Sequence, residues 1–193
     1  KELIKKAGKV LAFEVDKRFK EELENIKDKN LELIYDDAMK YSWKGFNKIV
    51  SNIPYSLSER VIIKSIKYEV SELTIIVGEK FKEKLMEETK VGIFARLFYS
   101  IEPILFIDKE NFSPPPRIDS WLIKLNWKDK ISDKEKLMRK ILSKEGKTKN
   151  AIMYGLVEYG KTKNQSREII KNMNLSKQVL EKSIKKSTAK FLI

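Results

Sequence analysis

The sequence contains neither cysteine nor histidine, and these two absences narrow the chemistry that it can perform. Without cysteine the chain has no disulfide, no thiolate nucleophile and no thiolate metal ligand. Without histidine it has no imidazole to serve as a general base, a triad member or a metal ligand. We therefore expect no metal site, and any catalysis has to use carboxylates, amides, aromatic rings and the backbone.

Long apolar segments are also missing, since no run approaches the roughly 18 residues that a membrane span needs. The N-terminal residues 1–6 lack the apolar core and the small-residue cleavage site of a signal peptide. Hydrophobic residues still make up 41% of the 193 residues, which is enough to bury a core and excludes wholesale disorder. We expect a cytoplasmic protein without membrane contact.

Basic residues outnumber acidic ones by 41 to 28, which gives a net charge of +13 and a pI near 9.6. Such an excess favours a polyanionic partner such as nucleic acid. Most lysines in such a chain are solvated side chains on helix faces, so the charge alone does not locate a site. The best candidates for RNA contact are six basic residues near the C-terminus: Arg139, Lys144, Lys147, Lys149, Lys161 and Arg167.

Short apolar strands alternate with helical segments along the first two thirds of the chain. Four strands are predicted, at 10–16, 31–35, 47–52 and 73–77. Helices are predicted near 17–27 and 58–68. This alternation indicates βαβ units and a parallel sheet. After a helix at 94–98, two further strands at 102–107 and 120–127 are expected to form an antiparallel edge of that sheet.

From about residue 128 onward the strand pattern stops. Short amphipathic helices with lysine-rich polar faces are predicted at 133–143, 147–160, 164–172 and 176–185. We therefore place a domain boundary near residue 128. The expected organisation is an α/β domain at 1–127, followed by a small helical domain at 128–193.

Three of the predicted strands end in polar residues at one edge, Glu14, Asp37 and Asn52. In open α/β sheets, ligands bind beyond the carboxyl ends of the strands. Glu14 is suited to accept hydrogen bonds from two ribose hydroxyls, and Asp37 could accept one from the amino group of an adenine ring. These residues predict a nucleoside pocket. Alternatively, each acid only caps the helix that follows its strand.

The segment Asn52-Ile53-Pro54-Tyr55 directly follows a buried strand. The Asn52 amide and the Pro54 carbonyl offer two hydrogen-bond acceptors, and Tyr55 offers a flat ring. Two acceptors beside a stacking surface fit a planar base that carries an amino group, held unstacked as base-modifying enzymes require. The alternative is an ordinary turn, which asparagine and proline both favour.

Two segments of the sequence resemble a known family of enzymes. Asn52–Tyr55 looks like the (Asn/Asp)-(Leu/Ile/Pro)-Pro-Tyr signature of amino-group methyltransferases that depend on S-adenosylmethionine. Asn111–Ser120 resembles the Phe-x-Pro-Pro-Pro-(Lys/Arg)-Val-Asp-Ser segment of the rRNA adenine dimethyltransferase family (KsgA type). Val10–Asp16 and Tyr35–Met39 are similar to further segments of that family, in the right order and spacing. The resemblance covers roughly residues 1–127, and we expect an archaeal source.

This resemblance implies a Rossmann-like class I methyltransferase sheet followed by a small all-helical, RNA-binding C-terminal domain. The implied enzyme is an rRNA adenine N6,N6-dimethyltransferase. It would transfer methyl groups from S-adenosylmethionine to two adjacent adenosines near the 3′ end of small-subunit rRNA during ribosome biogenesis. The implied partner is the immature small ribosomal subunit, and we expect a monomer. Two other functions stay open: a methyltransferase of large-subunit rRNA, and a ribosome-assembly factor that binds RNA without catalysis.

The resemblance also implies which residues bind the cofactor. Glu14 would bind the ribose of S-adenosylmethionine, and Val15 would pack beside its adenine ring. Asp37 would accept a hydrogen bond from the adenine amino group, with a backbone contact from Ala38. Asn52 is counted among the residues near the cofactor as well.

A second set of residues is implied to hold the target adenine. Asn52 and the carbonyl of Pro54 would accept hydrogen bonds from its amino nitrogen, while Tyr55 and Phe112 would sandwich its ring. For Phe112 the alternative is simple core filling, because phenylalanine beside a proline run often anchors a loop.

The sequence departs from the family pattern in its glycines. Family members carry a Glu-(Ile/Val)-Gly-x-Gly-x-Gly segment on the first strand, where the backbone approaches the methionine part of the cofactor. None of the seven glycines here lies in a Gly-x-Gly pattern. By position that segment belongs before Lys1, so we expect an N-terminally shortened chain that lacks the first strand and binds the cofactor poorly or not at all. Asp36 also stands where the family usually has glycine.

Overall fold

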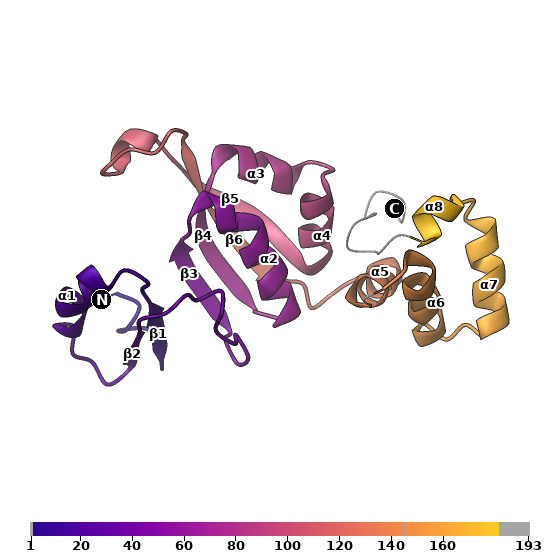
Figure 1. The fold of residues 1–193 in the computed structure, drawn as a ribbon, viewed down its shortest axis with the longest axis horizontal. Coiled ribbons are helices and arrows are strands. Elements are labelled where there is room, and N and C mark those ends of the chain that lie inside the picture. The colour runs from indigo at the N-terminus through magenta and orange to yellow at the C-terminus, as the bar shows by residue number, and fades with distance from the viewer. Residues whose placement is uncertain (1, 145, 182–193) are drawn as a thin grey trace. The chain divides into compact units, whose positions relative to one another are not determined.

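The computed structural model describes residues 2–144 and 146–181 (Figure 1). The chain divides into two compact units, Lys1–Lys44 and Gly45–Ile193. None of the described helices combines the length and the hydrophobicity that crossing a bilayer requires.

The first unit is built on a two-stranded parallel sheet formed by β1 (Val10–Phe13) and β2 (Leu31–Ile34). A 3-10 turn at Lys17–Phe19 and the short helix α1 (Lys20–Glu24) connect the two strands (Figure 1). Asp16 begins this connection, because its carboxylate accepts hydrogen bonds from the side chain and the backbone N–H of Arg18. These bonds lower the pKa of Asp16 to about 2.

The predicted helix at 17–27 is therefore shorter in the structure than the sequence pattern suggests. It ends at Glu24, with Asn25 as its C-cap residue. Asparagine competes with the helical backbone through its own side-chain hydrogen bonds, which favours helix ends over helix interiors.

The second unit contains a four-stranded sheet in the order β3-β4-β6-β5. Its strands are β3 (Lys48–Asn52), β4 (Glu72–Gly78), β5 (Tyr99–Ile107) and β6 (Ser120–Trp127). β3 and β4 pair in parallel, whereas β6 runs antiparallel to both of its neighbours. The predicted antiparallel edge on a parallel sheet is thus confirmed. Within the described residues, however, the two parallel pairs belong to two separate sheets and not to one.

Three helices accompany this sheet: α2 (Ser58–Lys67), α3 (Glu79–Met86) and α4 (Lys90–Phe98) (Figure 1). α2 connects the parallel strands and packs on α4, while α3 and α4 contact the sheet itself. Leu73 and Ile75 of β4 lie opposite Leu125 and Ile123 of β6, and all four are completely buried. Opposed residues of an antiparallel pair point to the same face, so this face forms the hydrophobic core.

Helix α3 was not predicted from the sequence. Its apolar residues Phe81 and Leu85 lie four positions apart, which is helical spacing, but the eight-residue helix offers only this one repeat, and only Leu85 is buried. The chain enters α3 directly from the end of β4 at Gly78, which brings the start of this helix next to the candidate site described below.

The described residues after Trp127 form the helices α5 (Asp133–Ser143), α6 (Thr148–Glu158), α7 (Lys163–Asn172) and α8 (Lys177–Glu181). They share a core of Met138, Ile141, Ala151, Ile152, Leu156 and Ile170. Reciprocal capping boxes begin α5 and α7. The four predicted helices are confirmed, except that the part of the last one beyond Glu181 lies outside the described residues. The proposed domain boundary near residue 128 stays a prediction.

Candidate active site and RNA-binding surface

In the first unit, Glu14 and Asp37 lie beyond the same edge of the β1–β2 sheet. The register pairs Phe13 with Ile34, and the Glu14 N–H continues the ladder by donating to the Ile34 carbonyl at 3.0 Å. Because the two strands run parallel, the residues that follow them leave the sheet at one edge. The structure therefore brings together the two acids for which the sequence predicts a role in nucleoside binding.

Both acids also make local hydrogen bonds. The Glu14 carboxylate accepts from the Asp16 N–H at 2.8 Å, and the Asp37 carboxylate accepts from the Met39 N–H at 2.8 Å. These bonds stabilise turns and not helix starts, since Asp16 is the N-cap after β1 and no helix lies in the described residues between β2 and β3, so the alternative that each acid caps a helix is wrong. A carboxylate has about four lone-pair positions on its two oxygens, so each acid keeps capacity to accept from a ligand hydroxyl or amino group.

The neighbours of these acids differ in their roles. Val15 is 65% exposed, so an apolar surface lies open beside Glu14. The Ala38 carbonyl accepts from the indole N–H of the buried Trp43 at 2.8 Å, which fixes the backbone after Asp37. Asp36, the residue that departs from the family pattern, accepts from the Asp37 N–H at 2.7 Å and so serves the turn.

In the second unit, Asn52 and Pro54 present acceptors at the carboxyl end of β3. Asn52 is the last residue of the strand and is exposed. The exposed Pro54 uses its carbonyl to accept from the Leu57 N–H at 2.8 Å, in the 3-10 turn that follows. A carbonyl oxygen has two lone pairs, so one remains for an external donor. Between them Ile53 is only 7% exposed and anchors the segment in the core.

Tyr55 is held by a residue that comes 65 positions later in the chain. Its hydroxyl lies 2.5 Å from the hydroxyl of Ser120, which is fully buried at the start of β6. The β4–β6 register places Ser120 opposite Gly78. A Cβ atom added at Gly78 would lie 3.4 Å from the Tyr55 ring and 2.7 Å from Ile118. One packed wall beside the Asn52–Tyr55 segment is therefore formed by Tyr55, Gly78, Ile118 and Ser120.

The proline-rich segment that includes Phe112 is fastened at its far end by Asp119. The Asp119 carboxylate accepts from the Lys109 N–H at 3.0 Å, and its carbonyl accepts from the Glu79 N–H at 3.0 Å. Phe112 is half-buried, and among the ring contacts of the described residues none joins it to Tyr55. A sandwich of a base between these two rings stays a prediction.

The six basic residues predicted to contact RNA are used in different ways. Arg139 donates to the carbonyls of Leu97 at 3.0 Å and Lys128 at 3.1 Å. Its guanidinium also stacks over Phe98 and Trp127, 4.9 and 5.1 Å from the ring centres, and its burial lowers its pKa. Arg139 thus fastens α5 to the ends of α4 and β6, and its contact with RNA stays a prediction.

Two of the lysines have intramolecular partners. The Lys144 ammonium lies 4.9 Å from the centre of the Tyr154 ring, and Lys147 pairs with Glu181 at 2.6 Å. Such exposed interactions contribute at most about 1 kcal/mol, so either lysine can exchange its partner for a phosphate.

The remaining basic residues are exposed. Lys161 follows the end of α6, whereas Lys149 and Arg167 line one pocket together with Lys171. Sequence reasoning missed Lys171. The signal that could have found it is its spacing, since residues four apart lie on the same helix face and Lys171 is four residues after Arg167.

No group of three acidic residues among the described positions is arranged to hold a metal ion. Polar residues at the carboxyl ends of parallel strands, with helices connecting those strands, are typical of a Rossmann-like α/β fold.

Comparison with solved structures supports this fold class. The structure is similar to that of a dimethyladenosine transferase from Plasmodium falciparum, with a TM-score of 0.62 and 23% identity over 89% of this chain and 67% of that one. It is also similar to the 23S rRNA methyltransferase ErmE, with a TM-score of 0.60 and 15% identity over 91% of this chain and 76% of that one. At these identities the likeness shows the fold alone, and it confirms the predicted class.

Sequence comparison identifies the family. The ribosomal RNA adenine dimethylase family matches residues 1–190. The chain is 34% identical to a protein of Thermococcus gammatolerans named "Probable ribosomal RNA small subunit methyltransferase A", over 72% of this chain and 53% of that protein. A protein of the same name from Pyrococcus furiosus is 33% identical, over 63% of this chain and 47% of that protein. The chain belongs to the ribosomal RNA adenine dimethylase family, and it spans about half the length of these relatives.

Proposed function

We propose that this protein is an S-adenosylmethionine-dependent rRNA adenine N6,N6-dimethyltransferase that modifies two adjacent adenosines near the 3′ end of small-subunit rRNA. The observation that carries the proposal is the contact between Tyr55 and Ser120 at 2.5 Å. It joins the Asn52–Tyr55 segment to the end of the proline-rich segment, so the two motifs form parts of one wall. Membership of the rRNA adenine dimethylase family supports the same reaction.

The residues at the edge of the β1–β2 sheet fit the nucleoside part of the cofactor. Glu14 would accept from the ribose hydroxyls, and Asp37 from the adenine amino group, with the acceptor capacity that their local bonds leave. The exposed Val15 would cover one face of the adenine ring, and the fixed backbone at Ala38 would lie beside it. When bound, S-adenosylmethionine supplies an electrophilic methyl group on a sulfonium.

Asn52 and Pro54 would act on the target adenine. Its amino nitrogen is a weak nucleophile because the lone pair is delocalised into the ring. Two acceptors directed at the two amino hydrogens favour a more pyramidal nitrogen with a freer lone pair, while Tyr55 and Phe112 hold the ring in place. Alignment of this kind can contribute roughly 7–11 kcal/mol to a rate enhancement. The methylated nitrogen can release its proton to water, so the site needs no imidazole.

The charge favours a polyanionic partner, and membership of the rRNA adenine dimethylase family points to rRNA, so the partner that we propose is single-stranded RNA within the immature small ribosomal subunit. Unpaired loop bases can be splayed into a pocket without breaking a duplex. Exposed lysines such as Lys149 and Lys161 would contact phosphates, so binding should weaken as the salt concentration rises. We propose that the protein acts as a monomer in the cytoplasm.

Methyl transfer tests this function directly. The full-length gene product is mixed with labelled S-adenosylmethionine and immature small subunits, and label in the rRNA is measured. Asn52→Ala and Tyr55→Ala should each abolish transfer and leave cofactor affinity nearly unchanged. Asn47→Ala is the matched control, because Asn47 is exposed and lies just before the other end of β3. Equal loss of transfer and of cofactor affinity would contradict the assignment of Asn52 and Tyr55 to the target base.

The other two functions give different results in the same assay. Binding of the subunit without transfer would indicate an assembly factor, and transfer to large-subunit rRNA alone would indicate the other class of methyltransferase.

Glu14→Ala tests the proposed role of Glu14 in binding the cofactor. In the full-length gene product this substitution should mainly weaken the binding of S-adenosylmethionine, measured by calorimetry, because it removes the acceptor for the ribose hydroxyls. Glu21, which is exposed on α1, supplies a control of the same residue type. Unchanged affinity in the Glu14 variant would exclude that role.

A further inference from the structure

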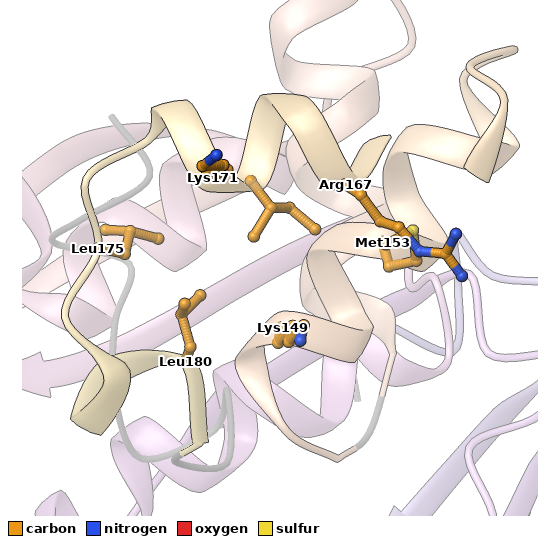
Figure 2. Close-up of a pocket in the computed structure, with 7 residues that line it drawn as sticks. Lys149, Met153, Arg167, Lys171, Leu175 and Leu180 are labelled. Carbon is orange, nitrogen blue, oxygen red and sulfur yellow. The ribbon is translucent and has the colours of Figure 1, made fainter. Parts of the chain in front are cut away.

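A pocket of about 320 Å³ lies among the C-terminal helices (Figure 2). Lys149 and Met153 line it from α6, and Arg167, Ile170 and Lys171 line it from α7. Leu175, from the segment after α7, and Leu180 of α8 complete the lining. Figure 2 shows Met153 and Arg167 at one end of the pocket and the two leucines at the other.

The lining divides into an apolar floor and a cationic rim. Ile170 is 5% exposed, and Met153, Leu175 and Leu180 are half-buried, so these four residues offer a surface without hydrogen-bonding side chains. The rim consists of Lys149, Arg167 and Lys171, all exposed. Among the described residues, no acidic side chain lines the pocket.

The three rim cations are available for an external anion. Other lysines of these helices form ion pairs, such as Lys140 with Glu158 and Lys147 with Glu181. Within the described part of the chain, none of the three rim residues forms an ion pair; Arg167 donates only to the Asn164 side chain, at 3.0 Å. The pocket thus combines a positive rim with an apolar interior, and its ligand has to carry both an anionic group and an apolar face.

A single nucleotide has this combination in one unit. Its phosphate matches the cations, and its base offers an apolar face to the floor. An arginine guanidinium can stack on a base, and the methionine thioether makes favourable contacts with aromatic rings. The volume lies near the lower end of the roughly 300–1,000 Å³ of small-ligand pockets, which suits one nucleotide and is too small for a helix about 10–12 Å across. An acidic peptide side chain would satisfy the rim but leave the floor uncovered.

We propose that this pocket holds one unpaired nucleotide of the RNA substrate, separate from the adenine that is methylated. The phosphate lies against Lys149, Arg167 and Lys171, and the base lies on the floor formed by Met153, Ile170, Leu175 and Leu180. The proposal rests on the proposed function in one respect, namely that the partner is RNA. It assigns the helical part a definite binding position, where the charge alone indicates only a diffuse basic surface.

NMR can detect directly whether a ligand contacts the floor residues. The methyl groups of methionine, isoleucine and leucine are labelled for NMR in the full chain, which is titrated with a single-stranded RNA pentanucleotide. The resonances of Met153, Ile170, Leu175 and Leu180 should shift together. The same RNA with an abasic ribose at its centre should bind about tenfold more weakly, because it retains the phosphates and lacks the base.

Charge variants test the rim. The double variant Arg167→Glu/Lys171→Glu should weaken RNA binding and reduce the slope of log affinity against log salt by about 0.7, as expected when the contact to one phosphate of a single strand is lost. Lys130→Glu/Lys134→Glu is the matched control, with the same change of charge at two exposed positions outside the pocket. An equal loss in both double variants would overturn the proposal in favour of a diffuse basic surface.

Two further results would also overturn it. One is RNA binding that leaves the four floor residues unshifted. The other is an acidic pentapeptide that shifts them more strongly than the RNA does, which would indicate a protein partner. Failure of the proposed function is distinguishable, because Asn52→Ala should abolish methyl transfer and leave these shifts unchanged. A full-length gene product that binds RNA in the pocket but never transfers methyl groups would support the pocket and reject the enzyme.

Discussion

The contact between Tyr55 and Ser120 allows a quantitative test of how the candidate site is built. The two hydroxyl oxygens are 2.5 Å apart, Ser120 is completely buried, and Tyr55 is half-buried. Tyr55→Phe leaves the buried Ser120 hydroxyl without this partner, which costs about 1–3 kcal/mol. Ser120→Ala leaves the Tyr55 hydroxyl unpaired, but that group is close enough to solvent to find water, so we expect about 1 kcal/mol or less.

The expected asymmetry is therefore that the tyrosine variant loses more stability than the serine variant. The coupling free energy should be about 0.5–1.5 kcal/mol in a double-mutant cycle with Tyr55→Phe/Ser120→Ala as the third variant. Free energies of unfolding are measured in urea, and equal m-values in all four proteins verify that the same surface unfolds. A coupling energy below about 0.3 kcal/mol would show that the two hydroxyls do not interact, and the common wall would then lack its central contact.

Two further substitutions test the helical part of the chain. At Gly155 an added methyl group would collide with Ile141 of α5, so Gly155→Ala should destabilise the protein by about 1–3 kcal/mol in urea, whereas Gly8→Ala, with open space around it, should change little. Equal effects would refute the close packing of α5 on α6. The second substitution concerns Glu135, whose pKa is lowered from 4.5 to about 2, chiefly by a hydrogen bond from Lys128. The Glu135–Lys128 pair adds to the free energy of unfolding above pH 4.5, and this contribution is lost as the pH falls towards 2. Over this pH range the free energy of unfolding should therefore fall by up to about 1 kcal/mol less in Glu135→Gln than in the wild type. Identical pH profiles of unfolding for variant and wild type would disprove the contribution of this ion pair.

Much of the fold could be predicted from the sequence because strands and helices carry their own periodicity. The strand at 120–127 and the helix at 133–143 occur with the predicted bounds, since the alternation in one and the apolar spacing in the other continue to their ends. Helix α3 was missed because its helical spacing is limited to the single pair Phe81 and Leu85. The separation of the strands into two sheets was also missed, because periodicity does not specify which strands pair.

In the candidate site, too, some residues could be predicted from the sequence and others could not. Asn52, Tyr55 and Phe112 could be selected from local motifs. The roles of Gly78 and Ser120 could not, because they depend on the register between β4 and β6, which joins residues far apart in the chain. Arg139 was interpreted as an RNA contact because it is basic and lies on a lysine-rich helix. Only the structure shows its guanidinium bonded to backbone carbonyls and stacked on aromatic rings.

The 65-residue separation of Tyr55 and Ser120 has a consequence for synthesis on the ribosome. At roughly 5–20 residues per second, about 3–13 seconds pass between the addition of the tyrosine and that of the serine. During this interval the nascent chain displays the aromatic ring without its anchor. The packed wall beside the Asn52–Tyr55 segment therefore cannot form until strand β6 has been synthesised and has paired with β4.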